Sequence, residues 1–573
     1  MGRKIVVIGA VAAGPKAAAR VKRLDLDAQV IMVDQAELIS YGGCGLPYYI
    51  SGDVSDINEL MSTSFHLKRD AKFFEGAKGV EVRTRTRALA IDRDQKTVRL
   101  QNLATEEIYS LDYDQLVLAT GSTPVRLPIP GADLPGVFTV ANPSDAEAIR
   151  EPVSKGEVEQ VVIIGGGAIG LELAEAFTEL WGLETAVVEL QEHLLPGLLD
   201  SPLARMVQAH VEAQGVKVYC GEQVQQLEAE NGRVARLVTS KRTLPADLVI
   251  MAVGVRPNSQ LAQEAGLLVG PTGGIVVNQR LQTSDPLIYA GGDCIENYHL
   301  LTGKRVHYPS GSIANRQGRV IGTNLNGGHE IFEGVVGSYI MKLFELSVGC
   351  TGLSLDAARR AGFDAFETLV SQADQAHFYP GQELMYLQLV TDRPTQRILG
   401  LQGVGAMGQG VKARIDAVGA MLKYKPTLDD LSNLEVAYAP PFAAALDILN
   451  AAANTAKNIL AGTNHPLPMD DFISIWKHKS EAGVTFLDIR ETDNAAPLVE
   501  KWGPLWVNIP QGELRYRLAD VPQDKRLILV CNAGMRSYES QVILDHAGIT
   551  GTVNLQGGYA ALKKAGVDLL ADD

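Results

Sequence analysis

Two cysteines occupy settings in which a lone thiol could do chemistry. Cys44 lies in the glycine-rich run SYGGCGLPY, residues 40–48, and Cys531 opens the run CNAGMR, residues 531–536. Neither has a second cysteine within a few residues, so each must take up sulfur or electrons alone, as a mixed disulfide, a sulfenate or a persulfide. Because two nucleotide-binding loops accompany these thiols, the residues indicate a redox enzyme that acts on sulfur.

The first nucleotide-binding loop, GAVAAG at residues 9–14, lies between a predicted strand, Ile5–Ile8, and a predicted helix, Lys16–Leu24. Its glycines permit a tight turn and close packing, the helix N-terminus receives a pyrophosphate, and an acid after the next strand takes a ribose hydroxyl. That strand is predicted at Val30–Val33, and Val11 stands where the usual pattern has its middle glycine. The candidate contacts here are Gly9, Ala10, Val11, Ala12, Gly14 and Asp34.

The second loop, GGGAIG at residues 165–170, fits the full pattern after a predicted strand at Gln160–Ile164. Glu189 ends the next strand, and an acid there repels a 2′-phosphate, so NADH is favoured over NADPH. A strand-like run at Leu248–Gly254 closes this second unit. The candidate nicotinamide-nucleotide contacts are Gly165, Gly167, Ile169, Gly170, Glu189 and Gly254.

Two further segments lie where nucleotide contacts are expected. The run LVLATGS ends a predicted strand with Ala119, Thr120 and Gly121, and the run AGGD places Asp293 where it could bond the ribityl chain of a flavin. With both glycine loops, the sequence resembles the flavoprotein disulfide reductases that carry two dinucleotide-binding domains. The resemblance covers about residues 1–450. It implies FAD in the first domain, NAD(P)H in the inserted one, and a dimerisation domain after them.

The single cysteine near the first loop is typical of one branch of that family. Residues 40–49 resemble the coenzyme A-disulfide reductases, NADH oxidases and NADH peroxidases rather than members with a cysteine pair. The runs HFYPG and VAYAPP, with Tyr379 and Tyr438, resemble the paired active-site tyrosines of the coenzyme A members, which come from the partner subunit of a homodimer. Phe378 stands where that pattern often has Tyr. The alternative is that both tyrosines are packed interface aromatics.

A basic stripe on the first helix favours a phosphate-bearing ligand. Lys16, Arg20 and Arg23 are spaced i, i+4 and i+7, so they share one helix face just after the nucleotide loop. Such a stripe suits the 3′-phosphate and pyrophosphate of coenzyme A, although the spacing alone favours a solvated face. The family resemblance places a coenzyme A site at this helix together with Ser40, and adds Lys72 and Asn315 as further candidates.

The segment around Cys531 has the features of a sulfur-transfer loop. It follows a predicted strand, Leu527–Val530, and precedes a helix, so successive N–H groups can stabilise a thiolate or persulfide while Arg536 adds a cation. Residues 468–573 resemble a rhodanese domain, whose active loop has six residues from Cys to Arg. The alternative is an inert cysteine in a degenerate, structural rhodanese fold.

Length and composition set the frame for these motifs. The 573 residues, with 46% hydrophobic residues and a net charge of −15, predict several domains and argue against a nucleic-acid partner. The chain shows no membrane-spanning run and no metal-ligand spacing, and Cys220, Cys294 and Cys350 are interpreted as structural. A reducing, cytoplasmic setting is expected. The predicted fold class is α/β: two Rossmann-like dinucleotide-binding domains (1–150 with 276–330, and 151–275), an α+β dimerisation domain (331–461) and a C-terminal α/β rhodanese domain (468–573).

The hypothesis that unites these features is an FAD- and NADH-dependent reductase of coenzyme A persulfide, polysulfide or disulfide. Electrons would pass from NADH through FAD to Cys44, and Cys531 would relay sulfane sulfur, with the pantetheine of coenzyme A as a swinging arm. Three alternatives stay open: a plain coenzyme A-disulfide reductase, an NADH oxidase or peroxidase that cycles Cys44 through a sulfenate, and a sulfur-carrier or redox-sensing protein without turnover. NADPH as the reductant also stays possible.

Overall fold

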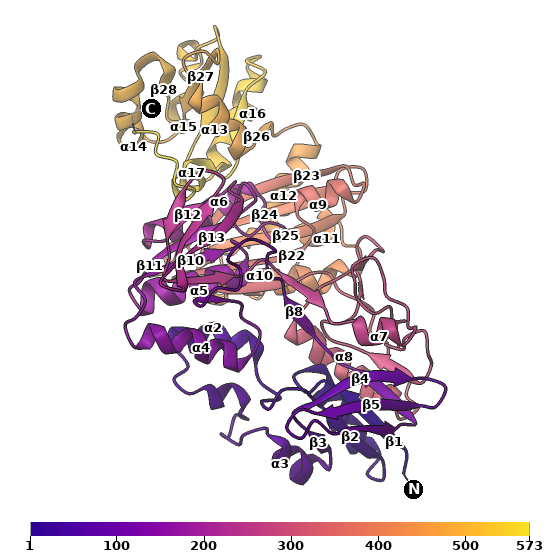
Figure 1. Cartoon of the computed structure of the whole chain (residues 1–573). Helices are drawn as coiled ribbons and strands as arrows, with labels where there is room; N and C mark the ends of the chain where they lie inside the picture. The colour runs from indigo at the N-terminus through magenta and orange to yellow at the C-terminus, as the bar shows by residue number, and fades with distance from the viewer. Residues whose placement is uncertain (1, 572–573) are drawn as a thin grey trace. The chain divides into compact units, whose positions relative to one another are not determined.

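The structure is a computed structural model that describes residues 2–571 (Figure 1). The chain divides into two compact units: Met1–Leu190 with Glu222–Val335, and Gln191–Gly221 with Val336–Asp573. The fold is mixed α/β, as predicted. The four domain boundaries drawn from the sequence stay a prediction. Among residues 2–571, every helix is too short or too polar to cross a membrane.

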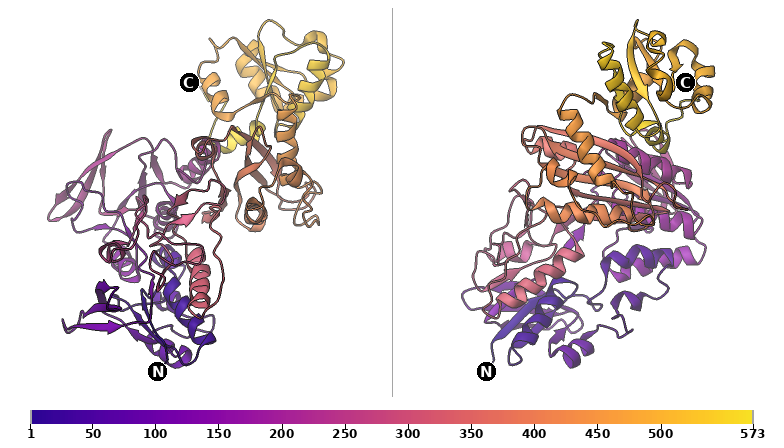
Figure 2. Two further views of the ribbon diagram at one scale, coloured as in Figure 1. Left: turned by 90° about the vertical axis from the view of Figure 1, so that its right-hand side faces the viewer. Right: turned by 180° about the vertical axis from the view of Figure 1, so that it is seen from behind.

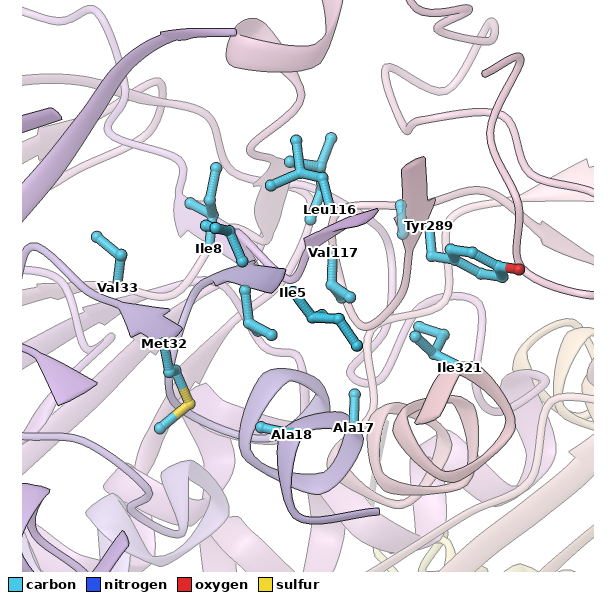
Figure 3. Close-up of a cluster of buried hydrophobic side chains, with 14 of the residues drawn as sticks. Ile5, Ile8, Ala17, Ala18, Met32, Val33, Leu116, Val117, Tyr289 and Ile321 are labelled. Carbon is cyan, nitrogen blue, oxygen red and sulfur yellow. The ribbon is translucent and has the colours of Figure 1, made fainter. Parts of the chain in front are cut away.

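The first sheet of the first unit is a parallel five-stranded sheet of order β18-β7-β1-β2-β3. Its strands are buried on both faces by apolar side chains, which is typical of a parallel sheet between helices. Figure 3 shows this core, where Ile5 of β1 and Val117 of β7 lie on the face of the sheet toward Ala17 of α1, and Ile8 lies on the opposite face. The strands are β1 Lys4–Ile8, β2 Gln29–Val33, β3 Glu81–Arg83, β7 Gln115–Leu118 and β18 Ile288–Ala290.

Two helices cover this sheet in direct contact, α1 (Ala13–Leu24) and α8 (Gly311–Asn324), although about 300 residues separate them in the chain (Figure 2). Glycines let them approach closely. A Cβ atom at Gly318 would lie 2.5 Å from the Ala13 carbonyl oxygen, and one at Gly322 would lie 2.6 Å from that of Ala17. Any larger residue at these positions would force the helices apart.

The second sheet of the first unit repeats the parallel pattern around β10 (Gln160–Ile164), with neighbours β11 (Glu184–Val188) and β16 (Leu248–Met251). Helix α5 (Ala168–Glu175) follows β10 and continues as a π-helical turn, η4 (Ala176–Leu180). The predicted strand at Leu248–Gly254 ends earlier, at Met251, and Gly254 lies beyond it with a φ of +100°. Short β9 (Val137–Phe138) completes the sheet beside β16.

Smaller antiparallel elements and short helices complete the first unit. Two antiparallel sheets are β4-β5-β6 and β13-β14-β15, and two strand pairs are β8-β17 and β19-β20. Their strands are β4 Thr86–Asp92, β5 Thr97–Asn102, β6 Ile108–Asp112, β8 Ser122–Pro124, β13 Val224–Glu230, β14 Arg233–Thr239, β15 Thr243–Pro245, β17 Val255–Pro257, β19 Asn297–Tyr298 and β20 Arg305–Val306, and the helices include α2 Leu46–Ser51, α3 Ala71–Phe73, α4 Pro143–Ser154 and α7 Gln260–Glu264.

The second unit contains an antiparallel sheet of order β21-β22-β25-β24-β23. Helix α10 (Gln409–Leu422) packs on β25 and β22, and α12 (Ile448–Leu460) packs on β23 and β24. The strands are β21 Tyr339–Leu343, β22 Leu346–Gly352, β23 Ala365–Ala373, β24 Leu384–Asp392 and β25 Ile398–Ala406, and two short helices are α9 Leu355–Arg360 and α11 Leu428–Ser432.

The starts of α10 at Gln409 and of α12 at Ile448 have local causes. Strand β25 runs through Gly403 and Gly405, where Cβ atoms would come within 3.1 and 3.0 Å of Val411. These glycines form a smooth surface under α10, so glycine here serves helix packing on a strand rather than a helix start. The second helix begins at Ile448 because Asp447 caps it by accepting the Leu449 N–H at 3.0 Å.

Residues 191–221, which include α6 (Ser201–Ala213) and β12 (Lys217–Tyr219), are anchored to the antiparallel sheet through Asp200. The buried Asp200 carboxylate accepts hydrogen bonds from the Leu355 N–H at 2.9 Å and from Gln402 at 2.5 Å. Gln402 also accepts the Asp200 N–H at 2.7 Å. Burial raises the pKa of Asp200. The interior position of this carboxyl depends on these bonds.

The C-terminal part of the second unit is a separate parallel sheet of order β26-β30-β29-β27-β28. One side of it packs on an aromatic cluster in which Trp476 contacts Phe486, Trp502 and Trp506. The strands are β26 Pro466–Leu467, β27 Val484–Asp488, β28 Trp506–Asn508, β29 Arg526–Val530 and β30 Val553–Leu555, and the helices are α13 Met469–Lys477, α14 Thr492–Trp502, α15 Gln511–Leu514, α16 Met535–His546 and α17 Gly558–Lys564.

Candidate functional site

The first glycine loop has the shape that a pyrophosphate requires. A side chain at Gly9, whose φ is +108°, would overlap the carbonyl oxygen of Ala119, and one at Gly14 would overlap that of Gly9. Helix α1 has no side-chain cap and no acid in its first turn, so its N-terminal N–H groups are available to an anion. Asp34 follows β2 and accepts the Ala10 N–H at 2.7 Å, which fixes the loop, and burial raises the pKa of this carboxyl.

The second glycine loop repeats this geometry. Gly165 also has a φ of +108°, and a side chain there would lie 2.5 Å from the Ala252 carbonyl oxygen. Glu189 is buried after β11 and accepts the Gly166 N–H at 2.7 Å, as Asp34 does in the first loop. Helix α5, whose N-cap is Gly167, likewise lacks a side-chain cap and an acid in its first turn. Both loops therefore fit a dinucleotide.

The exits of neighbouring strands converge beside the first loop. The Thr120 hydroxyl donates to the Asn258 carbonyl at 2.6 Å, and Gly121 adopts a φ of +69°. Asp293 follows β18; it accepts a hydrogen bond from the Ser122 hydroxyl and another from the Ser310 N–H, each at 3.2 Å. The position of Asp293 thus depends on β8 and on the start of α8.

Cys44 is exposed in a short 3₁₀ turn, Gly43–Gly45, directly before α2. Its sulfur lies at the N-terminus of α8, where a Cβ atom at Gly311 would be 3.9 Å away. Desolvation and the charges of Glu172 and Asp293 raise the pKa of Cys44, and the Gly311 N–H opposes that shift by hydrogen bonding to the sulfur. A helix N-terminus favours a thiolate, whereas nearby carboxylates disfavour it.

Two neighbours of Cys44 were not identified in the sequence. Glu172 lies on α5, which packs against α2, and burial raises its pKa to about 7. Tyr48 is on α2, and burial, Glu172, Asp53 and Cys44 raise its pKa. The only signal in the sequence was an acid two residues after the last glycine of the second loop. Its proximity to Cys44 depends on the packing of α5 on α2.

The three basic side chains of α1 that are candidates for phosphate binding make only a few contacts in the structure. Lys16 and Arg20 pack their stems near Gly318 and Gly322 of α8. Arg20 donates to the Thr323 hydroxyl at 3.1 Å and Arg23 to the Ala19 carbonyl at 3.0 Å. Within residues 2–571, none of the three basic side chains forms an ion pair with a carboxylate. Their charges therefore remain available to a phosphate.

Three other candidates for the same ligand lie on different elements. Asn315 is exposed on α8, one turn after Gly311, and donates to the Gly311 carbonyl at 2.8 Å. Ser40 is buried with a φ of +51° and donates its N–H to Ala10 at 2.7 Å. Lys72 is exposed on α3. The structure thus places Ser40 and Asn315 beside the Cys44 loop and the first glycine loop.

In the second unit, the two aromatic runs meet. The Ala376 N–H donates to the Pro440 carbonyl at 3.1 Å, and Phe378 and Tyr438 line one cavity of about 330 Å³ together with several alanines. Tyr379 is 38% exposed and does not line that cavity. Phe378 and Tyr438 thus share this cavity, and the roles of Tyr379 and Tyr438 stay a prediction.

Cys531 differs from Cys44 in being buried at the end of β29. Its sulfur accepts the Gly534 N–H at 3.1 Å and the Ser537 N–H at 3.4 Å, at the start of α16. Gly534 has a φ of +93°, which lets the loop turn its N–H groups inward. Arg536 lies 3.7 Å from Glu491 and retains partial exposure. The loop is therefore an anion-binding cradle around one sulfur.

This cradle is supported from two sides. The Cys531 carbonyl accepts the Tyr559 N–H at 2.8 Å, and the ring of Tyr559 lies 4.5 Å from the guanidinium of Arg490. Arg490 forms a buried ion pair with Asp488 at 2.6 Å. The neighbouring Gln556 accepts the Leu369 N–H of β23 at 2.8 Å, which ties the segment to the antiparallel sheet.

The three remaining cysteines lie outside the Cys44 and Cys531 loops, although Cys294 directly follows Asp293 and donates to the Leu118 and Gly291 carbonyls. Cys294 and Cys350 are buried, and desolvation raises the pKa of each, to about 12 for Cys350. Cys220 is partly exposed. Across residues 2–571, no three His, Cys, Asp or Glu side chains gather in a manner suited to a metal ion.

Comparison with known proteins agrees with this geometry. The family model described as pyridine nucleotide-disulphide oxidoreductase matches residues 3–318, and the model for the dimerisation domain of that family matches residues 340–449. A CoA-dependent NAD(P)H sulfur oxidoreductase from Pyrococcus abyssi is 37% identical over 455 residues, which are 79% of this chain and 98% of that protein.

Two solved structures match almost the whole chain. An NAD-dependent persulfide reductase from A. fulgidus is 38% identical with a TM-score of 0.92, over 97% of this chain and 99% of that one. The reduced CoADR-RHD protein from Bacillus anthracis is 32% identical with a TM-score of 0.90, over 99% and 98% of the two chains. Both matches extend over the parallel sheet that carries Cys531. The chain belongs to the pyridine nucleotide-disulphide oxidoreductase family.

Proposed function

We propose that this chain is an FAD- and NADH-dependent reductase of coenzyme A persulfide, polysulfide and disulfide. The observation that carries the proposal is the lone exposed Cys44 thiol at the N-terminus of α8, beside the first glycine loop. The relatives named as CoA-dependent sulfur oxidoreductase and persulfide reductase support the same substrate class.

The two glycine loops would hold the two cofactors. Gly9, Gly14 and Asp34 suit FAD, with Asp293 near its ribityl chain, and Gly165, Gly170 and Glu189 suit NADH. Held by these residues, FAD would supply the hydride acceptor for NADH and the electron pair that reduces sulfur at Cys44. The buried Glu189 carboxylate disfavours the 2′-phosphate of NADPH by charge repulsion.

Cys44 supplies the nucleophile. With coenzyme A persulfide, the Cys44 thiolate attacks the sulfur bonded to coenzyme A. An S–S bond forms, the terminal S–S bond breaks, and hydrosulfide leaves with its electron pair. Attack on the outer sulfur would instead give a Cys44 persulfide and the coenzyme A thiolate. The Gly311 N–H at the start of α8 stabilises the attacking thiolate by hydrogen bonding to the sulfur, and thereby opposes the upward shift of the Cys44 pKa caused by burial.

The basic face of α1 would bind the nucleotide end of coenzyme A. Lys16, Arg20 and Arg23 share that face without carboxylate partners among residues 2–571, and Asn315 lies at the start of the adjoining α8. Ser40 and Lys72 complete the proposed set. Arg guanidinium groups suit the phosphates because they form two parallel hydrogen bonds.

In a homodimer, the partner subunit would contribute the aromatic side chains. The family match to a dimerisation domain at residues 340–449 supports a dimer. We assign the proton-donating role to the phenol of Tyr438, since Phe378 has no hydroxyl and Tyr379 lies outside the shared cavity. Tyr379 remains a candidate on the family pattern alone.

The C-terminal segment from residue 468 onward would act as a rhodanese domain. The Cys531 cradle donates backbone N–H groups to the sulfur, as a thiolate or persulfide requires. Cys531 would take sulfane sulfur from a donor and pass it to coenzyme A, and Arg536 would balance the negative charge at the rim of the loop.

The decisive experiment is anaerobic steady-state NADH consumption with coenzyme A persulfide and with coenzyme A disulfide, together with sulfide release. A much larger kcat/KM for the persulfide, with stoichiometric sulfide, supports the proposed relay. A preference for the disulfide with little sulfide would leave a plain disulfide reductase and remove the relay role of Cys531. Catalytic efficiency with NADPH far above that with NADH would overturn the role of Glu189.

A further inference from the structure

The face of the antiparallel sheet around Asp200 holds more hydrogen-bond acceptors than donors. The amide nitrogen of Gln388 on β24 donates to the Asp200 carboxylate at 3.1 Å and to the Glu367 carboxylate of β23 at 2.6 Å. The Gln388 side chain is fully buried, and its amide oxygen has no hydrogen-bond partner anywhere in residues 2–571. Since buried polar atoms are almost always paired, this cluster is short of a donor, and a carboxyl proton can supply one.

The proton belongs on Glu367 because Asp200 is better supplied with donors. Asp200 also accepts the Leu355 N–H at 2.9 Å and the Gln402 amide at 2.5 Å. For Glu367, the Gln388 amide is the one donor that the described residues provide. Burial, together with the charge of Asp200, raises the pKa of Glu367 to about 7. Glu367 is therefore the carboxyl that gains and loses a proton near neutral pH.

Glu367 shares its face of β23 with residues that hold the C-terminal part of the second unit. Side chains alternate along a strand, so Glu367, Leu369 and Ser371 lie in one row. The Leu369 N–H donates to the Gln556 side chain and the Ser371 hydroxyl to the Gly557 carbonyl, each at 2.8 Å. A Cβ atom at Gly557 would lie 3.0 Å from the Leu369 side chain, so the two segments are in close contact. The segment that begins at Gln556 also supports the sulfur cradle.

Helix α6 reaches the same place. Asp200 is the residue before its first turn, and α6 contacts both α13 and α17 of the C-terminal part. Arg205 of α6 forms an ion pair with Asp470 of α13 at 2.9 Å, and a Cβ atom at Gly566 would lie 2.9 Å from that of Ala209. The acceptor-rich cluster thus lies where the antiparallel sheet, α6 and the C-terminal part meet.

We propose that Glu367 and Asp200, bridged by Gln388, form a protonation-dependent clamp that holds the C-terminal part, with Cys531, on the antiparallel sheet. The clamp is closed while Glu367 is a carboxylic acid. Loss of its proton to water leaves two carboxylates on one amide group with no further donor, so the contact of β23 with residues 556–557 loosens. This inference goes beyond the proposed function, because the docking does not depend on which sulfur compound is reduced.

Other charges face Glu367 and act on the same proton. Asp470 and Asp471 of α13 favour the neutral carboxyl, and Arg359 of α9 opposes them. Burial lowers the pKa of His210 on α6, so this histidine stays mostly neutral above pH 6.5. Further charged or titratable residues on the packed elements are Cys350 of β22, Asp356 and Arg360 of α9, Asp392 of β24, Arg205 and Glu212 of α6, Lys457 of α12, and Lys563 and Lys564 of α17.

The sign of the pH effect follows from linkage. Opening the clamp hydrates Glu367 and returns its pKa to about 4.3, so the closed state binds the proton more tightly. The stability that this proton gives to the closed state is fully present below about pH 4.3 and is lost as the pH rises through about 7. Between about pH 6 and about pH 8, the ratio of closed to open states should therefore fall about tenfold.

The test measures the contact itself by amide hydrogen exchange in the full-length protein. Protection factors, in which the intrinsic pH dependence of exchange is divided out, would be compared at about pH 6 and about pH 8 for peptides that cover residues 365–373 and 554–560. Glu367→Gln keeps the shape of the side chain and has no proton to lose. Glu500→Gln is the matched control, because Glu500 is an exposed carboxylate on α14 of the C-terminal part.

In the parent and in Glu500→Gln, we expect protection of both segments to fall about tenfold from the lower to the higher pH, whereas in Glu367→Gln it should change less than about twofold. An equal fall in Glu367→Gln and the parent would assign the titration to another group and overturn the clamp. If Glu367→Gln does not fold, the parent alone decides, because protection that is the same at both pH values also overturns it. NADH turnover on coenzyme A persulfide tests the reductase separately, so either idea can fail alone.

Discussion

The two thiols of this chain are built by different means. Cys44 is exposed at the N-terminus of a long helix, and its surroundings contain carboxyl groups that oppose ionisation. Cys531 is buried in a loop whose own N–H groups point at the sulfur. The Cys44 thiol is therefore accessible to a substrate and sensitive to neighbouring charges. The Cys531 loop instead directs N–H groups that can stabilise a negatively charged sulfur.

The largest expected effect is the loss of NADH-dependent turnover when Cys44 is replaced. Cys44→Ser should lower NADH-dependent reduction of both coenzyme A disulfide and persulfide by at least about a thousandfold, because the nucleophile is lost. Bound FAD should stay and should still be bleached by NADH in a stopped-flow absorbance measurement. Full turnover in this variant would show that Cys44 is not the redox thiol.

Cys531→Ser should produce a selective loss. Reduction of coenzyme A disulfide should be unchanged, and turnover with a donor that must first load the Cys531 loop should fall by roughly tenfold or more, because sulfur then has no covalent carrier. Parallel assays with the two substrates measure this. Equal loss on both substrates would point to a structural role and would erase the contrast between the thiols.

A smaller effect concerns the support of Cys44. Gly318→Ala places a methyl group against the Ala13 carbonyl and disturbs the contact between α1 and α8, the helix whose N-terminus lies beside Cys44. The free energy of unfolding of the protein should therefore fall by about 1–3 kcal/mol. Gly76→Ala is the matched control, because no atom lies within 4 Å of the position that its methyl group would take. Urea denaturation followed by flavin fluorescence compares them, and equal midpoints would mean that the helices adjust freely.

The smallest effect concerns the support of Cys531. Gln556→Ala leaves the buried Leu369 N–H without its acceptor and should cost about 1–2 kcal/mol. Faster hydrogen exchange in residues 556–560 and slower alkylation of Cys531, with Cys44 unaffected, are expected. Gln523→Ala, at an exposed position in the same unit, serves as control. If hydrogen exchange stayed at the parent rate, the antiparallel sheet would have no part in holding the cradle.

The sequence allowed much of the local structure around both thiols to be predicted. The strand and helix flanking each glycine loop are present, with Asp34 and Glu189 each accepting an N–H from its loop. These features depend on short-range spacing, which a single sequence displays directly. The mixed α/β class was predicted for the same reason.

Features created by distant packing could not be predicted. Glu172 becomes partly buried only when α5 packs on α2, and Gly311 reaches Cys44 across more than 260 residues of chain. The role of Gly403 and Gly405 of β25, which pack under Val411 of α10, also depends on the fold. The pairing of Phe378 with Tyr438 likewise required the fold of both segments.

The contact between α1 and α8 has a consequence for biosynthesis. Strand β18 and helix α8, residues 288–324, complete a sheet and a helix layer that begin at residue 4. During translation the first sheet cannot be completed until the chain beyond residue 324 has left the ribosome. Until then, one edge and part of one face of the sheet stay uncovered. Because contacts so distant in sequence form slowly, the first sheet is expected to reach its closed, flavin-ready form only after the inserted segment has been synthesised.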